Sequence, residues 1–141
     1  MAKYIELEVE GVKAVARLLE EDAPETCRRV WDLLPIEETL RHLSWAGEGA
    51  FFKTDLLRDP NFPLENRVSF YHPGTISYRP ENVEFALSYG QCQARTLMGN
   101  GGNLFANHFA QMEGDYKPFL EMLERTHEEG KKRISVRGRD A

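Results

Sequence analysis

The segment DAPETCRRVWDLLP, residues 22–35, carries the clearest local structure in this 141-residue sequence. Asp22 is a good N-cap residue with Glu25 as its capping-box partner, and Pro24 stands in the first turn, where a missing N–H costs little. Pro35 ends the helix, because the residue before a proline is driven out of the helical region. The apolar stripe that would pack this helix on a core consists of Cys27, Val30, Trp31 and Leu34.

A β-hairpin is predicted immediately before this helix. Residues 5–9 alternate isoleucine, leucine and valine with glutamate, which is the period-two pattern of a strand with one wet face. Glu10 and Gly11 can turn the chain, and residues 12–19 then form a second, more apolar strand. The helix at 22–34 therefore follows a strand pair directly.

The chain after the helix is rich in short strands. Residues 36–45 fit a helix or a strand, because apolar residues recur at both spacings. Loops are expected at 55–66, which holds two prolines, and at the glycine- and asparagine-rich 90–103. A second helix begins near Pro118 and ends at Gly130. Strands are expected over residues 50–54, 67–71, 75–79, 83–89, 104–110 and 131–137. Such short, evenly punctuated strands favour an antiparallel sandwich or barrel over βαβ units.

Length, composition and charge limit the classes of function. A chain of 141 residues is the usual size of one domain, and 41% apolar residues can furnish its core, so we expect a single domain over residues 1–141. The net charge of −5 argues against nucleic acid as a partner, because affinity for phosphate backbones comes from clustered lysine and arginine.

Targeting, membrane and metal signals are also absent from the sequence. Lys3 and three glutamates interrupt the first ten residues, and residues 96–112, the longest stretch without charge, hold glycines, amides and a histidine. Cys27 and Cys92 have no ligand-like spacing, which indicates reduced thiols. No motif joins the four histidines. We therefore expect a cytoplasmic protein with no membrane partner, no metal and no cofactor.

Several segments resemble cyclophilins in order and spacing. The helix start at 22–27 with its apolar pair Val30-Trp31 resembles the start of the first cyclophilin helix. Residues 73–77 resemble the Gly-x-x-Ser strand of that family, and residues 105–115 are similar to the strand and turn before its last helix. Small prokaryotic cyclophilin-like proteins of unknown function look closer still, through residues 45–48, 71–74 and 88–90. The resemblance, over roughly residues 4–137, implies a mainly β fold: a closed eight-stranded antiparallel cyclophilin-like barrel with two capping helices.

The prolyl isomerase signature of cyclophilins is missing. That family places an arginine before a phenylalanine, an apolar residue and a Gln-Gly-Gly-Asp run, whereas Arg41 here precedes Phe51-Phe52-Lys53-Thr54. Residues 111–115 hold a similar Gln-Met-Glu-Gly-Asp run, but in another part of the fold. We therefore expect a cyclophilin-fold protein without isomerase chemistry, and a divergent peptidyl-prolyl cis-trans isomerase is the alternative.

Any site must lie on an outer face or at a mouth, because a small eight-stranded barrel is filled by its own side chains. His42 and Glu48 are the candidate catalytic pair, since a carboxylate can hold an imidazole in one tautomer. The candidate ligand-binding residues are Trp45, Phe52, Tyr71, Tyr78, Tyr89, Arg95, Asn103 and His108. Large aromatic residues are more often core residues, and isolated histidines are more often structural, so that interpretation stands beside the functional one.

Three functions follow from these residues. The leading hypothesis is small-molecule (metabolite) binding, with an enzymatic role left open, because aromatic walls with a few polar groups are typical of a ligand pocket. It requires Trp45 and Tyr89 to lie on one side of the barrel. The second hypothesis is the divergent isomerase. The third is an oligomeric scaffold, a homo-oligomer whose exposed aromatic residues form the subunit interface.

Overall fold

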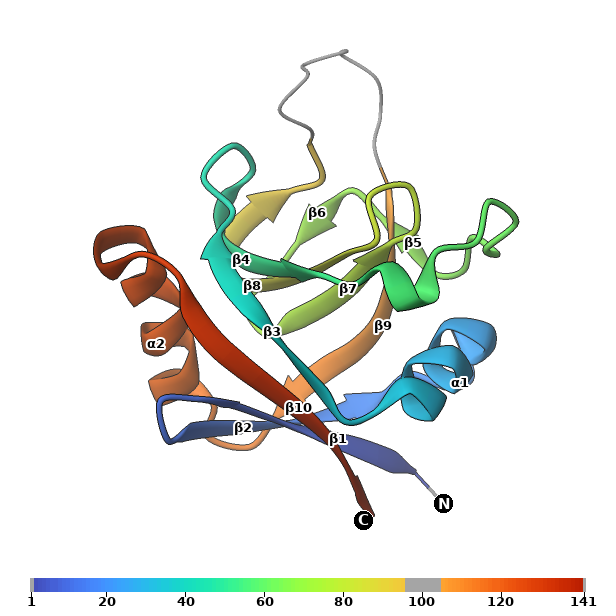
Figure 1. The fold of residues 1–141 in the computed structure, drawn as a ribbon, viewed down its shortest axis with the longest axis horizontal. Helices are drawn as coiled ribbons and strands as arrows, with labels where there is room; N and C mark the ends of the chain where they lie inside the picture. Colours follow the sequence, from blue (N-terminus) through green and yellow to red (C-terminus); the bar gives the residue numbers. More distant parts are fainter. Residues whose placement is uncertain (1, 96–104, 141) are drawn as a thin grey trace.

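The computed structural model describes residues 2–95 and 105–140, which form a mainly β protein with two helices (Figure 1). The strands are β1 Lys3–Val9, β2 Val12–Leu18, β3 Ile36–His42, β4 Gly47–Lys53, β5 Arg67–Val68, β6 Phe70–Tyr71, β7 Thr75–Arg79, β8 Glu84–Gln93, β9 Ala106–Glu113 and β10 Lys132–Asp140. The helices are α1 Pro24–Leu33 and α2 Lys117–Glu129, and a 3-10 turn, η1, spans Asp55–Leu57.

Eight of the strands close into an antiparallel barrel, as the resemblance to cyclophilins implies. Their order is β2-β1-β10-β3-β4-β8-β7-β9, and β9 pairs back onto β2 from Val15 opposite Glu113 to Leu18 opposite Ala110. The two short strands stand outside this ring, where β5 pairs with β9 and β6 pairs with β8. Closure leaves the ring without a free edge.

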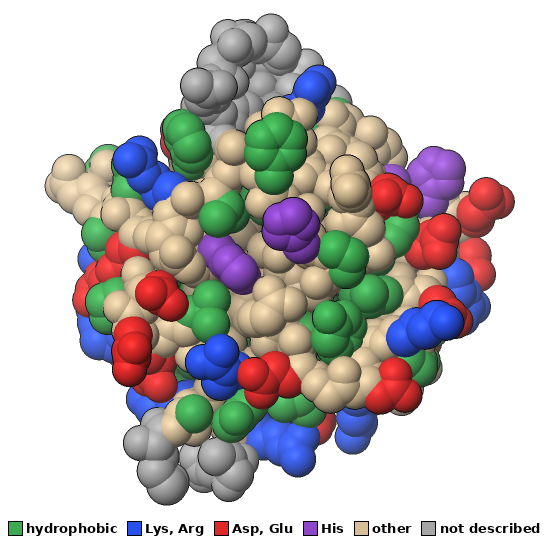
Figure 2. All heavy atoms as spheres, turned by 180° about the vertical axis from the view of Figure 1, so that it is seen from behind, with side chains coloured by type: hydrophobic (Ala, Val, Ile, Leu, Met, Phe, Trp, Pro, Cys, Tyr) green, Lys and Arg blue, Asp and Glu red, His purple; other side chains and the backbone are tan. Residues whose placement is uncertain are grey.

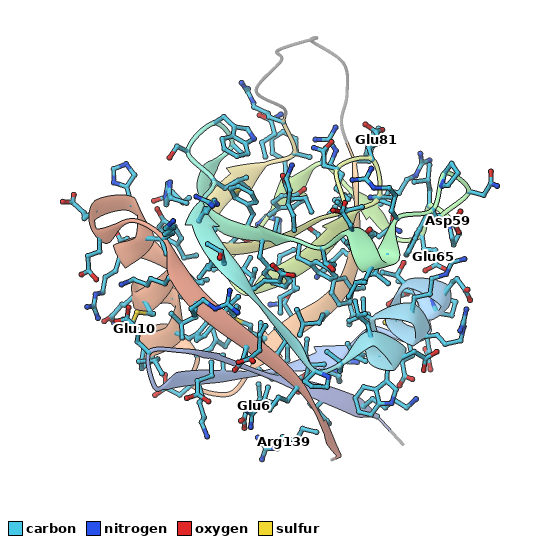
Figure 3. The ribbon with its side chains drawn as sticks, in the orientation of Figure 1. Glu6, Glu10, Asp59, Glu65, Glu81 and Arg139 are labelled. Carbon is cyan, nitrogen blue, oxygen red and sulfur yellow. The ribbon has the colours of Figure 1, made fainter. Side chains whose placement is uncertain are left out.

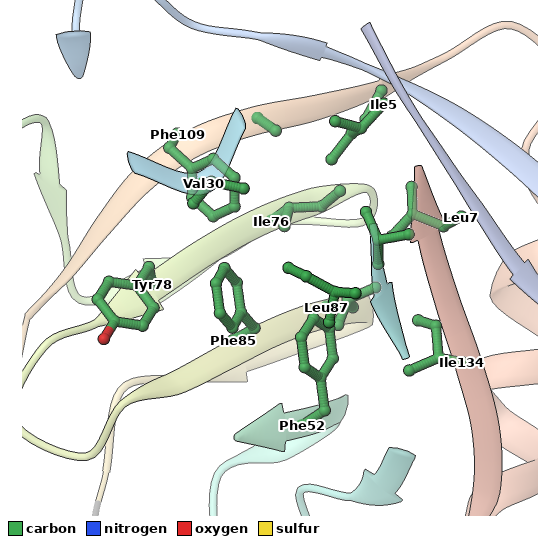
Figure 4. Packing of buried hydrophobic residues seen from close by; sticks show 14 of the residues in the cluster. Ile5, Leu7, Val30, Phe52, Ile76, Tyr78, Phe85, Leu87, Phe109 and Ile134 are labelled. Carbon is green, nitrogen blue, oxygen red and sulfur yellow. The ribbon is translucent and has the colours of Figure 1, made fainter. Parts of the chain in front are cut away.

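Apolar side chains fill the inside of the barrel (Figure 4). Phe52 and Phe85 stack with their ring centroids 4.7 Å apart, and Tyr78 packs on Phe85 at 4.8 Å. The two helices lie on opposite sides of the barrel (Figure 1) and both contribute to this interior cluster, α1 through Val30 and α2 through Leu123. Because the interior is packed solid, a ligand has to bind outside it.

Helix α1 begins differently from the prediction. The N-cap residue is Ala23, not Asp22, and no side chain of the cap position bonds to the helix. Glu65 supplies the cap from a loop forty residues away: its carboxylate accepts hydrogen bonds from the backbone N–H of Glu25 at 3.0 Å and of Thr26 at 2.9 Å. The predicted capping box between Asp22 and Glu25 is therefore wrong, because a remote carboxylate satisfies the N–H groups and complements the helix dipole.

The cap belongs to a wider, partly buried network, whose Glu65 lies beside α1 in Figure 3. The hydroxyl of Thr26 donates to Glu65 at 2.8 Å, and the Asn107 side chain donates to that hydroxyl at 3.1 Å. Asn107 also donates to the backbone carbonyl of Pro63 and accepts from the backbone N–H of Glu65. We call Thr26, Glu65 and Asn107 the helix-cap network. It fastens α1 and the loop before β5 to strand β9.

Three further segments refine the predicted elements. The ambiguous residues 36–45 form strand β3, which ends at His42. Strand β8 continues to Gln93, into the region predicted as a loop, and strand β9 runs on to Glu113. No helix among the described residues is long and apolar enough to cross a membrane.

Candidate functional site

The outward face of strands β7, β8 and β9 carries a group of polar side chains. Strands β7 and β8 send alternate residues into the interior cluster, so Ser77, Arg79 and Glu84 point to the outside. The register places Arg79 opposite Glu84, and it places Ser77 opposite His108 of β9. Side chains opposite one another in an antiparallel pair stand about 5 Å apart, so these residues are direct neighbours.

This outward face is covered by the chain itself. Residues 67–71 link β9 to β8, because β5 pairs with the former and β6 with the latter. Val68 and Tyr71 pack from this segment onto a second apolar cluster that includes Phe51 and Ala86. The polar side chains beneath are buried as a result: Ser77 is 0% exposed, Arg79 3% and Glu84 5%.

Three buried polar atoms on this face have no hydrogen-bond partner among the described residues: Ser77 Oγ, Arg79 Nε and His108 Nε2. Native structures pair nearly all buried polar groups, and each one left unpaired costs about 1–3 kcal/mol. Three on one face therefore indicate a place where a group other than the described residues completes the bonding. We call Tyr71, Ser77, Arg79, Glu84 and His108 the outer-face cluster.

Arg79 is the buried cation of this cluster. One of its terminal nitrogens donates to the backbone carbonyl of Arg95 at 3.3 Å, and the other donates to Glu81 at 3.2 Å. The Glu81 side chain is 75% exposed, so this ion pair is largely screened by water. No ion pair joins Arg79 to its neighbour Glu84, although both are described. Arg79 thus keeps an unused N–H in a dry environment.

Burial shifts the other ionisable groups toward their neutral forms. It raises the pKa of Glu84, against the opposing effects of Lys53 and Arg79. It lowers the pKa of His108, and it raises the pKa of Tyr71 to about 12, with the nearby Ser77 side chain opposing that rise. At neutral pH the histidine and the tyrosine are uncharged. The cluster therefore presents hydrogen-bond donors beside the fixed positive charge of Arg79 and the carboxyl of Glu84, whose ionisation burial disfavours.

A pocket of about 330 Å³ adjoins the cluster at Tyr71. It is lined by Ala46, Phe70, Tyr71, His72, Gln91, Cys92 and Gln93. Its volume lies in the range of small-molecule sites, and Phe70, 63% exposed, gives it an open aromatic wall. Figure 2 shows hydrophobic and histidine side chains gathered near the middle of the rear face, with charged side chains around them.

Larger hollows lie elsewhere on the surface. One of about 580 Å³ borders Trp31 and Arg137, and one of about 610 Å³ lies over β1 and β2 beside Tyr4. None of the residues that line them belongs to the outer-face cluster, whereas Tyr71 lines the smaller pocket and belongs to that cluster. Chemistry rather than size therefore selects the smaller pocket beside the outer-face cluster.

Two predicted ligand-binding residues belong to the barrel interior instead. Phe52 is 3% exposed and Tyr78 is 0% exposed, and both belong to the interior cluster. Neither faces the surface on which the sequence analysis placed it, because strand alternation turns both rings inward. The Tyr78 hydroxyl is the fourth unpaired buried atom, but it lies among apolar rings.

The predicted acid–base pair is divided. The ring nitrogens of His42 are hydrogen-bonded to the hydroxyls of Tyr89 at 2.7 Å and of Ser44 at 2.8 Å. Glu48 accepts instead from the backbone N–H of Gln91 at 2.9 Å, so the prediction of a His42–Glu48 hydrogen bond is not met. Burial, and then the nearby His127, lower the pKa of His42. No three metal-ligand side chains gather within the described part of the chain.

The remaining predicted residues fall into two groups. Tyr89 packs against the interior cluster and bonds to His42, on the side of the barrel that contacts α2. Trp45 packs against the second apolar cluster, and its indole N–H donates to the backbone carbonyl of Arg95 at 3.2 Å. Tyr71, Arg95 and His108 lie with Trp45 on the outward face, whereas Asn103 lies outside the described residues. The single predicted surface thus separates into two, so the requirement that Trp45 and Tyr89 share one surface is not met.

Three residues of the outer-face cluster were not among the predicted site residues: Ser77, Arg79 and Glu84. The signal that could have found them is the period-two alternation of residues 75–79 and 83–89, which puts all three on one face. Alternation normally indicates a solvent-facing side. The sequence does not show that residues 67–71 return to cover it.

Comparison with known proteins supports the fold and leaves the function open. A family model described as "Protein of unknown function (DUF3830)" matches residues 5–137, and no curated protein sequence matches the chain. The structure of McbB in complex with tryptophan is similar with a TM-score of 0.74 and 18% identity, covering 94% of this chain and 44% of that one. The solution structure of the hypothetical protein AF2241 from Archaeoglobus fulgidus is similar with a TM-score of 0.65 and 19% identity, covering 96% of this chain and 94% of that one. The chain thus spans less than half the length of McbB, and at these identities the likeness shows the fold alone.

Proposed function

Since the chain belongs to the DUF3830 family of unknown function, we propose its role from its geometry: the protein binds a small molecule on the outside of the barrel. The binding site is the pocket of about 330 Å³ beside the outer-face cluster. The ligand lies against Phe70 and Tyr71 and directs its polar group toward the buried donors behind them.

The single observation that carries this proposal is the concentration of unpaired buried polar atoms behind the pocket. Ser77, Arg79 and His108 each contribute one, and all three come from neighbouring positions of two paired strands. An uncompensated buried polar group destabilises the native state. Selection for a ligand accounts for retaining three of them side by side, because the ligand supplies the missing partners.

The tryptophan complex of McbB supports the proposal from a different direction. That protein shares the barrel fold at 18% identity, and its structure holds an aromatic amino acid. A barrel of this kind is therefore compatible with a small aromatic ligand, and the aromatic walls at Phe70 and Tyr71 suit such a ligand here.

Thermal-shift screening of a small-molecule metabolite library tests the proposal, because a ligand of the native state raises the melting temperature. The test variant is Phe70→Ser, at a 63% exposed pocket residue, and the matched control is Leu64→Ser, at a 60% exposed residue outside the pocket. We expect compounds that stabilise the wild type and Leu64→Ser but not Phe70→Ser. A library without such compounds, or equal shifts in both variants, contradicts the proposal.

The other hypotheses drawn from the sequence stay predictions. A protease-coupled proline-peptide assay tests the divergent isomerase. A size measurement in solution tests the oligomeric scaffold, and a monomer of 16.2 kDa would contradict it. Four further expectations from the sequence also stay predictions. They are the cyclophilin resemblance, the single domain over residues 1–141, the cytoplasmic location, and the candidate roles of His42 and Glu48.

A further inference from the structure

We infer that the ligand of this pocket carries a carboxylate, which Arg79 and Ser77 bind behind Tyr71. The inference rests on the proposed function and narrows it to one chemical class: small carboxylic acids with an apolar body. Three features of the outer-face cluster lead to it, namely its uncompensated charge, the arrangement of its donors and the character of the adjoining pocket.

The charge of Arg79 is not neutralised inside the cluster. Moving a guanidinium out of water costs several kcal/mol unless a well-placed anion compensates. Glu84 stands opposite Arg79, but the two form no ion pair, and burial favours the neutral form of that carboxyl. Glu81 does form an ion pair with Arg79, from a side chain that is 75% exposed and lies at the periphery of the molecule in Figure 3. A buried cation with only an exposed partner is ready for an anionic ligand.

The unpaired atoms are arranged as donors for one small anion. Ser77 precedes Arg79 by two positions on the same face of β7, which separates their backbones by about 7 Å. Ser77 Oγ and Arg79 Nε both carry a hydrogen to donate, and His108 Nε2, opposite Ser77, donates in one of its tautomers. The two oxygens of a carboxylate accept up to four hydrogen bonds, which is sufficient for these three.

Arginine binds carboxylates through pairs of neighbouring N–H groups. In Arg79 the unused Nε–H lies beside the terminal nitrogen that now donates to Glu81 at 3.2 Å. A ligand carboxylate that takes both N–H groups replaces the exposed Glu81 and forms the two parallel bonds that Glu81 does not. A phosphate brings a second negative charge, for which the cluster has no second buried cation.

The pocket defines the rest of the ligand. Tyr71 lines the pocket and is also the neighbour of Ser77, so its side chain forms the wall between the two spaces. A rotation of that side chain lets a carboxylate reach Arg79 while the ligand body stays against Phe70. Ala46, Phe70 and Cys92 give the pocket an apolar part on which an apolar portion of the ligand body packs, and polar side chains of the same pocket (His72, Gln91 and Gln93) leave room for polar substituents.

Matched pairs of acids and amides test this inference. The probes are phenylacetate with phenylacetamide and indole-3-acetate with indole-3-acetamide, because each pair has one shape and differs in charge. Inorganic phosphate is the third probe. Binding is followed by thermal shift and by the NMR signal of the Arg79 side-chain Nε–H. We expect at least one acid to bind tenfold or more tightly than its amide and to move that signal.

Variants of Arg79 and Ser77 test whether these side chains bind the carboxylate of the ligand. Arg79→Met should weaken acid binding at least tenfold, whereas Arg125→Met, at an exposed arginine paired with Glu129, should leave it unchanged. Arg79→Lys should retain part of the affinity, and Ser77→Ala should lose severalfold. Circular dichroism verifies that each variant is folded.

The outcomes separate this inference from the proposed function. Three results would each overturn the inference that the ligand carries a carboxylate: equal binding of acid and amide, wild-type affinity in Arg79→Met, or stronger binding of phosphate alone. If none of the acids binds while other compounds bind in a Phe70-dependent way, the inference fails and the proposed function stands. If no compound binds in a Phe70-dependent way, both fail.

Discussion

Two neighbouring residues of strand β9 belong to two different groups of buried polar side chains. The first group makes its hydrogen bonds within the chain, whereas the second contains atoms without a partner among the described residues. Asn107 is 0% exposed and points to the helix-cap network, where it donates twice and accepts once. His108 points to the opposite face, into the outer-face cluster, where its Nε2 has no partner among the described residues. Strand alternation separates the two groups by the thickness of one sheet.

The difference indicates which buried polar groups hold the fold and which await a ligand. Every bond of the helix-cap network is made within the chain, so removing one member leaves the others unpaired at about 1–3 kcal/mol each. In the outer-face cluster that cost is already present in the native state. Removing a member should therefore affect binding more than stability.

The largest expected effect comes from breaking the satisfied network. Asn107→Ala removes the hydrogen-bond partners of the Glu65 backbone N–H and the Pro63 carbonyl, takes one of two bonds from the Thr26 hydroxyl, and opens a small cavity. We expect the free energy of unfolding to fall by about 2–4 kcal/mol in urea denaturation. Glu121→Ala, at an exposed residue of α2, is the control and should change it by less than about 0.5 kcal/mol. If Asn107→Ala lowers the free energy of unfolding by less than about 1 kcal/mol, the contrast between the two groups of buried polar side chains is wrong.

Glu84 should give the next effect, and its sign depends on pH. Its folded-state pKa is raised above the ordinary 4.5, so the unfolded chain releases the proton first as the pH rises. Stability is lost between pH 4.5 and the folded-state pKa. Glu84→Gln cannot ionise, so its stability relative to wild type should increase as the pH rises through that window. Urea denaturation from pH 4 to 7 measures it, and a difference independent of pH would show that Glu84 is not desolvated.

His108 should make the free energy of unfolding depend on pH with the opposite sign to Glu84. Its pKa is lowered from 6.5, chiefly by burial, so below pH 6.5 the unfolded chain takes up a proton before the folded chain does. Stability should therefore fall as the pH falls from 6.5, and His108→Gln should reduce that slope. His42 contributes a slope of the same sign, so His42→Gln is the companion variant. An unchanged slope in His108→Gln would mean that water reaches its ring.

Local signals predicted both helices and a set of short strands in a sandwich or barrel, and the resemblance to cyclophilins implied the closed eight-stranded barrel. The alternation of residues 5–9, the apolar stripe of residues 27–34 and the prolines near the helix ends act within a few positions of one another. Residues 36–45 stayed ambiguous, since their apolar pattern fits both periods and only pairing with β10 and β4 decides it.

The site was less accessible to prediction because its contacts are long-range. Glu65 caps a helix forty residues earlier in the chain, and no local pattern announces that. The aromatic side chains of Tyr71 and Tyr78 look equivalent in the sequence, yet one covers the outward face and the other fills the interior. Tyr71 and His108 were nevertheless among the predicted ligand-binding residues, and both belong to the outer-face cluster.

Ser77→Ala has the smallest expected effect, and pairing it with Thr26→Val sharpens the comparison most, because the pair tests one hydroxyl from each group. Thr26→Val keeps the side-chain shape but removes a hydroxyl that both donates and accepts in the helix-cap network, so we expect a loss of about 1–3 kcal/mol. Ser77→Ala removes a buried hydroxyl that has no partner, so we expect no loss and a gain of up to about 1 kcal/mol. Urea denaturation of both variants without ligand gives the two values. A loss above 1 kcal/mol in Ser77→Ala would mean that the nearby Tyr71 hydroxyl or an internal water already pairs this hydroxyl in the absence of ligand.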